Sequence, residues 1–217
     1  LASDELRFFL TVVAGSTLLI AWNIRGLYSS FAQALRYAVF QVASIISTTG
    51  FATVDFAMWP TFCRMALLVL MFSGGCAGST AGGIKTVTFL VLVLTIWARA
   101  RGKSTVCAFK RTIPDEQTQN AMIIAFIVLA LAVFGGIFIS ATSPMDFTDA
   151  VYEAVSALAT VGLSAGGTAS LSIPAQILII IYMYFGRVGV LTISLGFLAG
   201  NRAEERFRYA ETNLLIG

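Results

Sequence analysis

The sequence contains no histidine and few charges, since Asp, Glu, Lys and Arg together make up 12% of its 217 residues. The missing histidine excludes imidazole acid–base catalysis and metal sites built on imidazole. The charged fraction is well below the share of roughly 25% that is usual in soluble domains. Because 58% of the residues are hydrophobic, the composition excludes an ordinary soluble domain, a disordered chain and a nucleic-acid-binding protein.

Cysteine and proline are also scarce. The three cysteines, Cys63, Cys76 and Cys107, form no CxxC pair, so the sequence predicts neither a disulfide framework nor a zinc site. The chain is instead rich in uncharged apolar runs, and a helix needs roughly 20 such residues to cross a bilayer. The runs cover residues 8–24, 65–84, 86–97, 121–143 and 154–186. The sequence therefore predicts an all-α membrane protein embedded in the lipid bilayer, with no enzymatic activity and no nucleic-acid partner.

The few charges are unevenly distributed. Basic residues cluster after two of the spans, at Arg99, Arg101, Lys103, Lys110 and Arg111, and again at Arg202, Arg206 and Arg208. The positive-inside rule makes both clusters cytoplasmic. Acidic residues, namely Asp55, Asp146, Asp149 and Glu153, are expected on the extracellular side. This asymmetry suits a path for cations across the cytoplasmic membrane, although ordinary solvated loop ends explain each residue equally well.

The sequence resembles itself at one fixed shift, which places position 40 over position 152. Under this repeat shift, residues 40–52 align with 152–164, and 71–74 align with 183–186 without a gap. The identical pairs in the first alignment are Ser44 with Ser156, Thr48 with Thr160, and Gly50 with Gly162. Each unit reads as a span, a short helix, a Thr-x-Gly loop and a second span. We therefore expect one repeat over residues 1–111 and another over 112–217.

The short helices of the two units, roughly residues 32–47 and 146–159, are too short to cross a bilayer comfortably, at about 21–24 Å. Each leads into a loop rather than a basic flank, so we expect both to be re-entrant pore helices. Irregular backbone at membrane depth persists only where it is buried in protein or lines a water-filled cavity. The loops at 48–51 and 160–163 should therefore line a wet path.

Thr-x-Gly loops have the properties of a carbonyl-lined cation filter. Glycine adopts a positive φ at no steric cost, and a preceding Thr or Val is stiff at χ1. Main-chain carbonyls replace the hydration shell of the ion in potassium filters, and the C-terminal end of a helix favours a cation. We expect potassium to bind the carbonyls of Thr48, Thr49, Gly50, Phe51, Thr160, Val161, Gly162 and Leu163. A single Thr-x-Gly is typical of a simple turn, and its duplication favours the filter.

The second span of the first unit carries five glycines within residues 74–83. One helix over residues 60–101 would be about 60 Å long, twice the thickness of the hydrocarbon core. We predict a helix break and an intramembrane gating loop made of Gly74, Gly75, Gly78, Ser79, Thr80, Gly82 and Gly83. The alternative is a packing face of small residues spaced four apart. A phosphate loop is rejected, because Ile84 interrupts the G-x-x-x-x-G-K-[ST] pattern and no strand precedes it.

The second unit has Arg187 at the position of Gly75, and no glycine-rich run follows it. Arg187 lies about fourteen residues from each end of its predicted span, and a charge inside a membrane span indicates a functional site. We expect it to face a wet cavity or a carboxylate and to act as an electrostatic barrier to cations beneath the filter. A structural partner for carbonyl groups at a helix break is the alternative role.

Four stretches, residues 47–53, 74–85, 160–164 and 186–189, together resemble the Trk/Ktr/HKT superfamily of potassium transporters. Members of that superfamily have four span–pore helix–span units around one pore. The resemblance implies that this chain supplies the third and fourth units, half of a pseudo-fourfold pore. Because the chain opens with Leu1 and residues 208–217 resemble the C-terminus of the family, we expect the N-terminal half to lie upstream.

The resemblance also implies roles and partners. Residues 74–83 match the intramembrane gating loop of the family, and Arg187 matches its arginine below the filter. The membrane subunit is similar to ones that form homodimers and sit on a cytoplasmic ring of nucleotide-binding regulatory subunits, for which the loop 99–111 and the tail would be docking surfaces. Phe51 and Leu163 stand where potassium channels have a tyrosine, so selectivity over sodium stays open.

The predicted function is potassium uptake across the cytoplasmic membrane through a carbonyl-lined filter with a gating loop. Potassium is the substrate, sodium is a possible coupling ion, and no cofactor is expected in this chain. Two alternatives remain. One is a sodium- or proton-coupled secondary transporter with broken helices, and the other is a non-transporting membrane assembly subunit whose glycines only pack helices.

Overall fold

The structure, a computed structural model, describes residues 4–76, 79, 81–103, 105–108 and 111–189. It is helical, apart from a short hairpin in the described residues. The α-helices are α1 Asp4–Ile24, α2 Phe31–Ile46, α3 Thr61–Phe72, α4 Thr86–Ala100, α5 Asp115–Thr142, α6 Phe147–Leu158 and α7 Ile173–Val188. Three 3-10 turns are η1 Arg25–Leu27, η2 Phe56–Met58 and η3 Thr168–Ser170. The antiparallel hairpin pairs β1 Cys107–Ala108 with β2 Arg111–Thr112.

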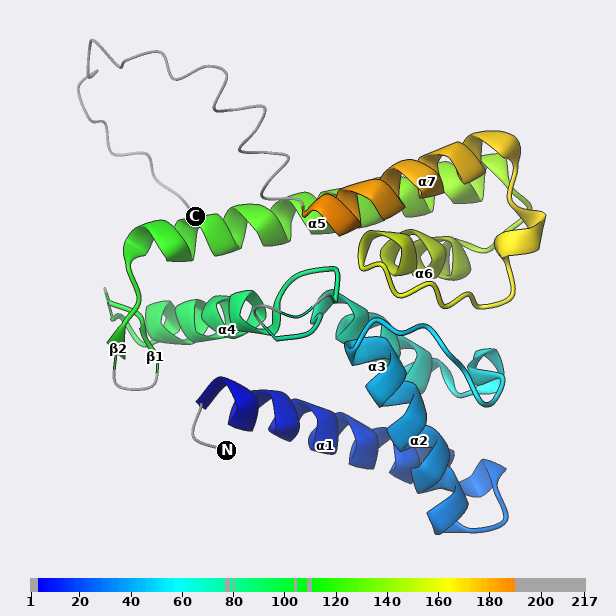
Figure 1. Cartoon of the computed structure of the whole chain (residues 1–217), viewed down its shortest axis with the longest axis horizontal. Helices are drawn as coiled ribbons and strands as arrows, with labels where there is room; N and C mark the ends of the chain where they lie inside the picture. The colour runs from blue at the N-terminus through cyan, green and yellow to red at the C-terminus, as the bar shows by residue number, and fades with distance from the viewer. Residues whose placement is uncertain (1–3, 77–78, 80, 104, 109–110, 190–217) are drawn as a thin grey trace.

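The helices form two groups of three. In the first group α1 packs on α2 and on α3, and α2 also contacts α3. In the second group α5 packs on α6 and on α7, and α6 also contacts α7. The two groups meet where α3 contacts α6, and α4, which belongs to neither group, lies beside α5 (Figure 1).

Local sequence signals explain where several helices begin. The Ser30 side chain accepts a hydrogen bond from Gln33 N at 3.2 Å at the start of α2, and Ser172 accepts one from Ala175 N at 3.4 Å at the start of α7. Such N-caps satisfy amides that have no partner inside the helix. Helix α5 begins at Asp115 rather than at residue 121 as the hydropathy predicts. The acidic residues of its first turn complement the helix dipole, so the helix extends beyond the apolar run.

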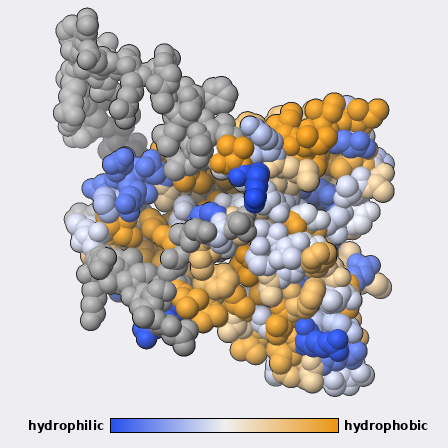
Figure 2. Space-filling model, in the orientation of Figure 1, coloured by the Kyte–Doolittle hydropathy of each residue, from blue (hydrophilic) through white to orange (hydrophobic). Residues whose placement is uncertain are grey.

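Among the described residues, two helices are long and apolar enough to cross a membrane by length and composition, Leu6–Leu27 and Asp115–Thr142. Helix α5 has 28 residues, which corresponds to about 42 Å. Large apolar side chains face outward on several helices; Trp22, Phe126 and Ile180 are 63%, 73% and 63% exposed. Figure 2 shows apolar surface over the face that α5 and α7 form at the upper right. Such a surface suits lipid or further protein rather than water.

Several element bounds in the two groups agree under the repeat shift. Helix α2 ends at Ile46 and α6 at Leu158, and α3 starts at Thr61 and α7 at Ile173. The turns η2 and η3 also correspond at both ends under this shift. The two groups differ in the length of the helix that follows, α3 in the first group and α7 in the second. Helix α3 ends at Phe72, whereas α7 runs to Val188, past the position that corresponds to Phe72.

Several predicted features fall outside the described residues. These are Gly78, Thr80, Lys110, the span expected beyond residue 189, and the basic cluster of Arg202, Arg206 and Arg208 with the tail after it. The apolar run 154–186, which is too long for one helix, contains the end of α6, a loop with the turn η3, and most of α7.

Candidate functional site

The two Thr-x-Gly loops begin where α2 and α6 end, and their backbones are nearly identical. Thr48 and Thr160 have φ of 53° and 54°, and Gly50 and Gly162 have φ of 78° and 81°. A positive φ at glycine was expected, whereas the same conformation at both threonines was not. A β-branched residue with positive φ is a real outlier, and a strained residue of this kind costs about 1–3 kcal/mol.

The hydrogen bonds that close the loops onto their helices also correspond. Thr48 N donates to Ile45 O at 3.0 Å, and Thr160 N donates to Ala157 O at 3.1 Å. The next amide in each loop reaches one residue further back into the helix. These bonds are Thr49 N to Ser44 O at 2.8 Å and Val161 N to Ser156 O at 2.9 Å. The left-handed threonine thus reverses the chain, so that two successive loop amides donate hydrogen bonds to carbonyls at the end of the helix.

Six main-chain oxygens of the two loops accept no hydrogen bond from the part of the chain that the structure describes. Among the described residues, no hydrogen bond ends on a main-chain carbonyl of residues 48–50 or 160–162. The carbonyl of Phe51 differs, because it accepts the hydroxyl of Ser44 at 2.6 Å. Carbonyls that no protein donor satisfies require water or a cation as partner when they lie in a membrane protein.

The two loops lie directly against each other. A Cβ built on Gly50 would overlap the carbonyl oxygen of Val161 and would lie 3.3 Å from its carbonyl carbon. No other residue type fits at position 50 without a shift of the main chain of the second loop. The loops therefore share one location in the fold, although they belong to different repeat units. Phe51, next to Gly50, is 69% exposed, whereas Leu163 is 5% exposed.

The predicted break in the second span of the first unit is present. Helix α3 stops at Phe72 and α4 starts at Thr86. Between them the chain folds back on itself: Gly74 N donates to Ile84 O at 2.7 Å, and the Thr86 hydroxyl donates to Gly74 O at 2.5 Å. Lys85 donates to the carbonyl oxygens of Ser79 and Ala81 at 3.1 and 2.5 Å. Lys85 thus holds described parts of the glycine-rich segment through two of its main-chain carbonyls.

The glycine-rich loop packs under the second Thr-x-Gly loop. A Cβ built on Gly82 would overlap the Thr160 hydroxyl and would lie 2.8 Å from Ala159 O. Gly186 of α7 approaches the same place, since a Cβ there would lie 2.9 Å from Cγ2 of Thr160. Glycine is needed at positions 82 and 186 because the main chain passes so close to the end of α6.

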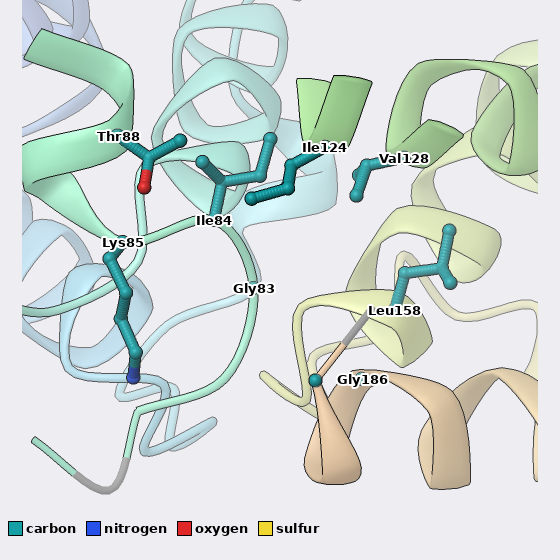
Figure 3. A pocket seen from close by; sticks show the side chains of 9 residues that line it. Gly83, Ile84, Lys85, Thr88, Ile124, Val128, Leu158 and Gly186 are labelled. Carbon is teal, nitrogen blue, oxygen red and sulfur yellow. The ribbon is translucent and has the colours of Figure 1, made fainter. Parts of the chain in front are cut away.

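Two cavities adjoin this contact. One of about 230 Å³ is lined by residues that include Gly83, Ile84, Ile124, Val128 and Leu158. Figure 3 shows the apolar side chains of this cavity coming from α5, from α6 and from Ile84, just before α4, with the Lys85 side chain extending away from them. The second cavity, of about 470 Å³, is lined by both Lys85 and Arg187, with Ser79, Ala81 and Gly82. Arg187 therefore shares a cavity with the glycine-rich loop.

Three charged residues have roles that the sequence did not reveal. Arg64 of α3 forms an ion pair with Asp149 of α6 and joins the two helix groups. Glu153 is 6% exposed and accepts hydrogen bonds from Ser164 and Thr168. Glu153 is buried, so the alternative of an ordinary solvated loop end is wrong for this residue, whereas Asp149 keeps a partly exposed side chain in its ion pair. A charge within an apolar helix was the available signal for Arg64.

Comparison with known proteins identifies the family. The family model described as "TrkH: Cation transport protein" matches residues 8–205. The chain belongs to this TrkH family of cation transport proteins. The assignment agrees with the expectation of a transporter rather than an enzyme, and the helical fold with long apolar segments agrees with a membrane location.

Curated relatives of the TrkH family chain are named as uptake proteins. It is 34% identical over 175 residues to the potassium/sodium uptake protein NtpJ of Enterococcus hirae, covering 78% of this chain and 39% of that protein. It is 34% identical over 180 residues to the Ktr system potassium uptake protein B of Vibrio alginolyticus, covering 83% and 39%. The chain thus spans about two fifths of the length of these relatives.

A solved structure has a similar fold. The crystal structure of the potassium transporter TrkH from Vibrio parahaemolyticus matches with a TM-score of 0.74 and 27% sequence identity. The match covers 89% of this chain and 44% of the transporter chain. The helix arrangement of this TrkH family chain therefore also occurs in a solved potassium transporter.

Proposed function

We propose that this chain forms half of a cation pore that takes up potassium across the cytoplasmic membrane. The observation that carries the proposal is the pair of contacting loops with matching left-handed backbones at Thr48 and Gly50 and at Thr160 and Gly162. Potassium as substrate is supported by the names of the relatives, which describe potassium uptake proteins.

The main-chain carbonyls of residues 48–51 and 160–163 supply the ion ligands in this proposal. Those of residues 48–50 and 160–162 accept no hydrogen bond from the described residues, so they are available to replace the hydration shell of a monovalent ion. Helices α2 and α6 end at these loops, and the negative ends of their dipoles favour a cation there. Sodium shares this chemistry, and the potassium/sodium uptake protein NtpJ is among the relatives.

The glycine-rich loop 74–83 serves as the gate, and Arg187 is the electrostatic barrier. The loop packs against Ala159 and Thr160, directly beneath the second filter loop. Arg187 and Lys85 line one cavity with Ser79, Ala81 and Gly82 of this loop, so a cation that leaves the filter meets positive charge there. In the closed state, glycine at position 82 permits the close contact between this loop and Thr160. Opening requires the loop to leave that contact.

Topology and partners complete the proposal. The basic end of α4 with the hairpin β1–β2 precedes α5, and Asp146 follows it, so α5 places them at opposite ends of the fold (Figure 1). We place the basic end in the cytoplasm and the loops near the extracellular side. The remaining half of the pore is supplied by the same protein upstream. A homodimer on a cytoplasmic nucleotide-binding ring is the assembly implied by the family resemblance.

Rubidium uptake tests this proposal. The complete protein that contains this chain is expressed in a bacterial strain without its own potassium uptake systems, and rubidium entry is measured with and without competing potassium or sodium. We expect saturable rubidium uptake that potassium inhibits more strongly than sodium does. Absence of rubidium and sodium flux from protein that is present in the membrane would overturn the proposal and favour an assembly subunit.

A secondary transporter is the second candidate, because α3 and α4 form a discontinuous helix next to the proposed ion path, as in many transporters that bind substrate near the midplane. Strict coupling distinguishes the two. In proteoliposomes, potassium entry that requires a sodium or proton gradient would favour the transporter, and flux down the potassium gradient alone favours the pore.

A further inference from the structure

Positions 41 and 153 correspond under the repeat shift, and both are buried in the short helices. Gln41 is fully buried, and Glu153 is 6% exposed. Within the described part of the chain, neither the oxygen nor the nitrogen of the Gln41 amide has a hydrogen-bond partner. Both carboxylate oxygens of Glu153 have one. Oε1 accepts from the Ser164 hydroxyl and Oε2 accepts from the Thr168 hydroxyl at 3.0 Å.

The partners of Glu153 organise the chain that leaves the second filter loop. Ser164 directly follows Leu163, and its oxygen also accepts from Gly166 N at 3.1 Å and from Thr168 N at 3.4 Å. The carboxylate thus holds a small hydrogen-bonded turn at one end of residues 160–163. Glu153 is the buried member of this network, whereas Ser164 is half-buried and Thr168 is exposed, so the turn is tied to the protein interior through the carboxylate.

The carboxylate and its two donors occur together in one unit and are absent together from the other. The positions that correspond to Ser164 and Thr168 are Ala52 and Phe56, which have no hydroxyl. The first unit uses a different bond, from the Ser44 hydroxyl to Phe51 O at 2.6 Å. The corresponding Ser156 hydroxyl is buried and has no partner among the described residues. Two loops with the same backbone are therefore held in place by different means.

Building on the function proposed above, we infer that Glu153 is a positioning residue that sets cation selectivity in the second filter loop by anchoring the turn 164–168. An ionised carboxylate is a pure acceptor with room for both hydroxyls. Replacement by an amide exchanges one acceptor oxygen for a donor, so one of the two hydroxyl bonds must reverse or break. The turn that follows the second filter loop is then no longer anchored, and the spacing of the carbonyls in residues 160–163 varies.

The test compares Glu153→Gln with Asp146→Asn in the complete protein. Asp146 is an exposed carboxylate at the start of α6, so its variant controls for the loss of one negative charge on the same helix. We expect Glu153→Gln to lower the preference for potassium over sodium in competed rubidium uptake by about tenfold, which corresponds to about 1.4 kcal/mol of ion discrimination. Asp146→Asn should keep the parental preference.

A second pair changes the donor instead of the carboxylate. Ser164→Ala removes one donor, and Ser170→Ala is its control, because Ser170 lies in the same loop and donates to Gly167 O. Ser164→Ala should reduce the preference as Glu153→Gln does, and the double variant should be no worse than either single one. If Glu153→Gln does not reach the membrane, the Ser164→Ala and Ser170→Ala pair still tests whether the anchored turn sets ion preference.

Parental ion preference in Glu153→Gln and in Ser164→Ala, with only lower protein amounts, would overturn the inference and make Glu153 a stabilising residue alone. Equal loss of preference in Asp146→Asn would overturn it too, because surface charge would then explain the effect. Failure of the proposed function is a separate result, since the parental protein itself would then take up no rubidium.

Discussion

Substitution of Gly50 by alanine is the sharpest test of the contact between the two loops. An L-residue in the left-handed region costs about 1–2 kcal/mol, and Gly50 has φ of 78°. The added Cβ would also overlap Val161 O, and relieving an overlap in a packed site costs about 1–3 kcal/mol. We therefore expect Gly50→Ala to lower the free energy of unfolding by about 2–5 kcal/mol.

Gly102 provides the matched control. Its φ is 70°, and a Cβ there would have nothing within 4 Å among the described residues. Gly102→Ala therefore carries the backbone cost alone, about 1–2 kcal/mol. The difference between the two variants measures the steric overlap with the second loop, without the contribution from φ.

Two assays on the complete protein follow from this comparison. Thermal unfolding in detergent should rank the parent above Gly102→Ala and Gly102→Ala above Gly50→Ala. Rubidium uptake with competing sodium should show parental ion preference in Gly102→Ala and a reduced preference in Gly50→Ala, because relief of the overlap moves the Val161 carbonyl.

Equal stability of the two variants would refute the contact between Gly50 and the second loop. Reduced stability of Gly50→Ala with unchanged ion preference would keep the contact but refute its place in a filter. The contact and the filter role can therefore fail independently.

Three further experiments test the gate, the barrier and the link between the helix groups. Arg187→Ala should raise rubidium flux and Arg187→Lys should not, in uptake measured at equal protein amounts; unchanged flux in the alanine variant would contradict the barrier. Lys85→Met should raise flux several-fold, because it removes the hydrogen bonds to two carbonyls of the glycine-rich loop, and parental flux would show that this clamp does not limit opening. Arg64→Gln with Asp149→Asn, measured as a double-mutant cycle by thermal unfolding, should give a coupling of about 1 kcal/mol, since both side chains are partly exposed; additive effects would show that the ion pair contributes no stability.

Local signals in the sequence predicted the helical elements well. The apolar run 8–24 lies within α1, and the run 121–143 lies within α5 except for its last residue, because burial or lipid contact requires apolar residues over a fixed length. Five glycines in ten residues located the break between α3 and α4, because glycine disfavours a helix interior. The short helices lie within one residue of their predicted starts and ends, at Phe31–Ile46 and Phe147–Leu158. The first turn of α5 was missed, because its residues are polar.

Interactions between distant residues could not be predicted in the same way. The Arg64–Asp149 pair spans 85 residues, and no periodicity encodes it. Glu153 reads as an outer carboxylate until the fold brings Ser164 and Thr168 to it. Lys85 reads as the end of an apolar run, whereas its ammonium group turns back to the glycine-rich loop. In each case the path of the folded chain brings the partners together, and the local sequence does not specify that path.

The strained threonines combine a local backbone feature with contacts between distant parts of the chain. A left-handed β-branched residue is unfavourable by about 1–3 kcal/mol, yet it occurs at both Thr48 and Thr160. A simple turn could avoid this cost by placing glycine there, as each loop does two residues later. The threonine is retained where its side chain packs, as Cγ2 of Thr160 does beside Gly186. Strain of the same size at corresponding positions of two contacting loops indicates that the fold preserves one particular arrangement of their carbonyls. A turn needs only to reverse the chain, whereas a filter needs that arrangement.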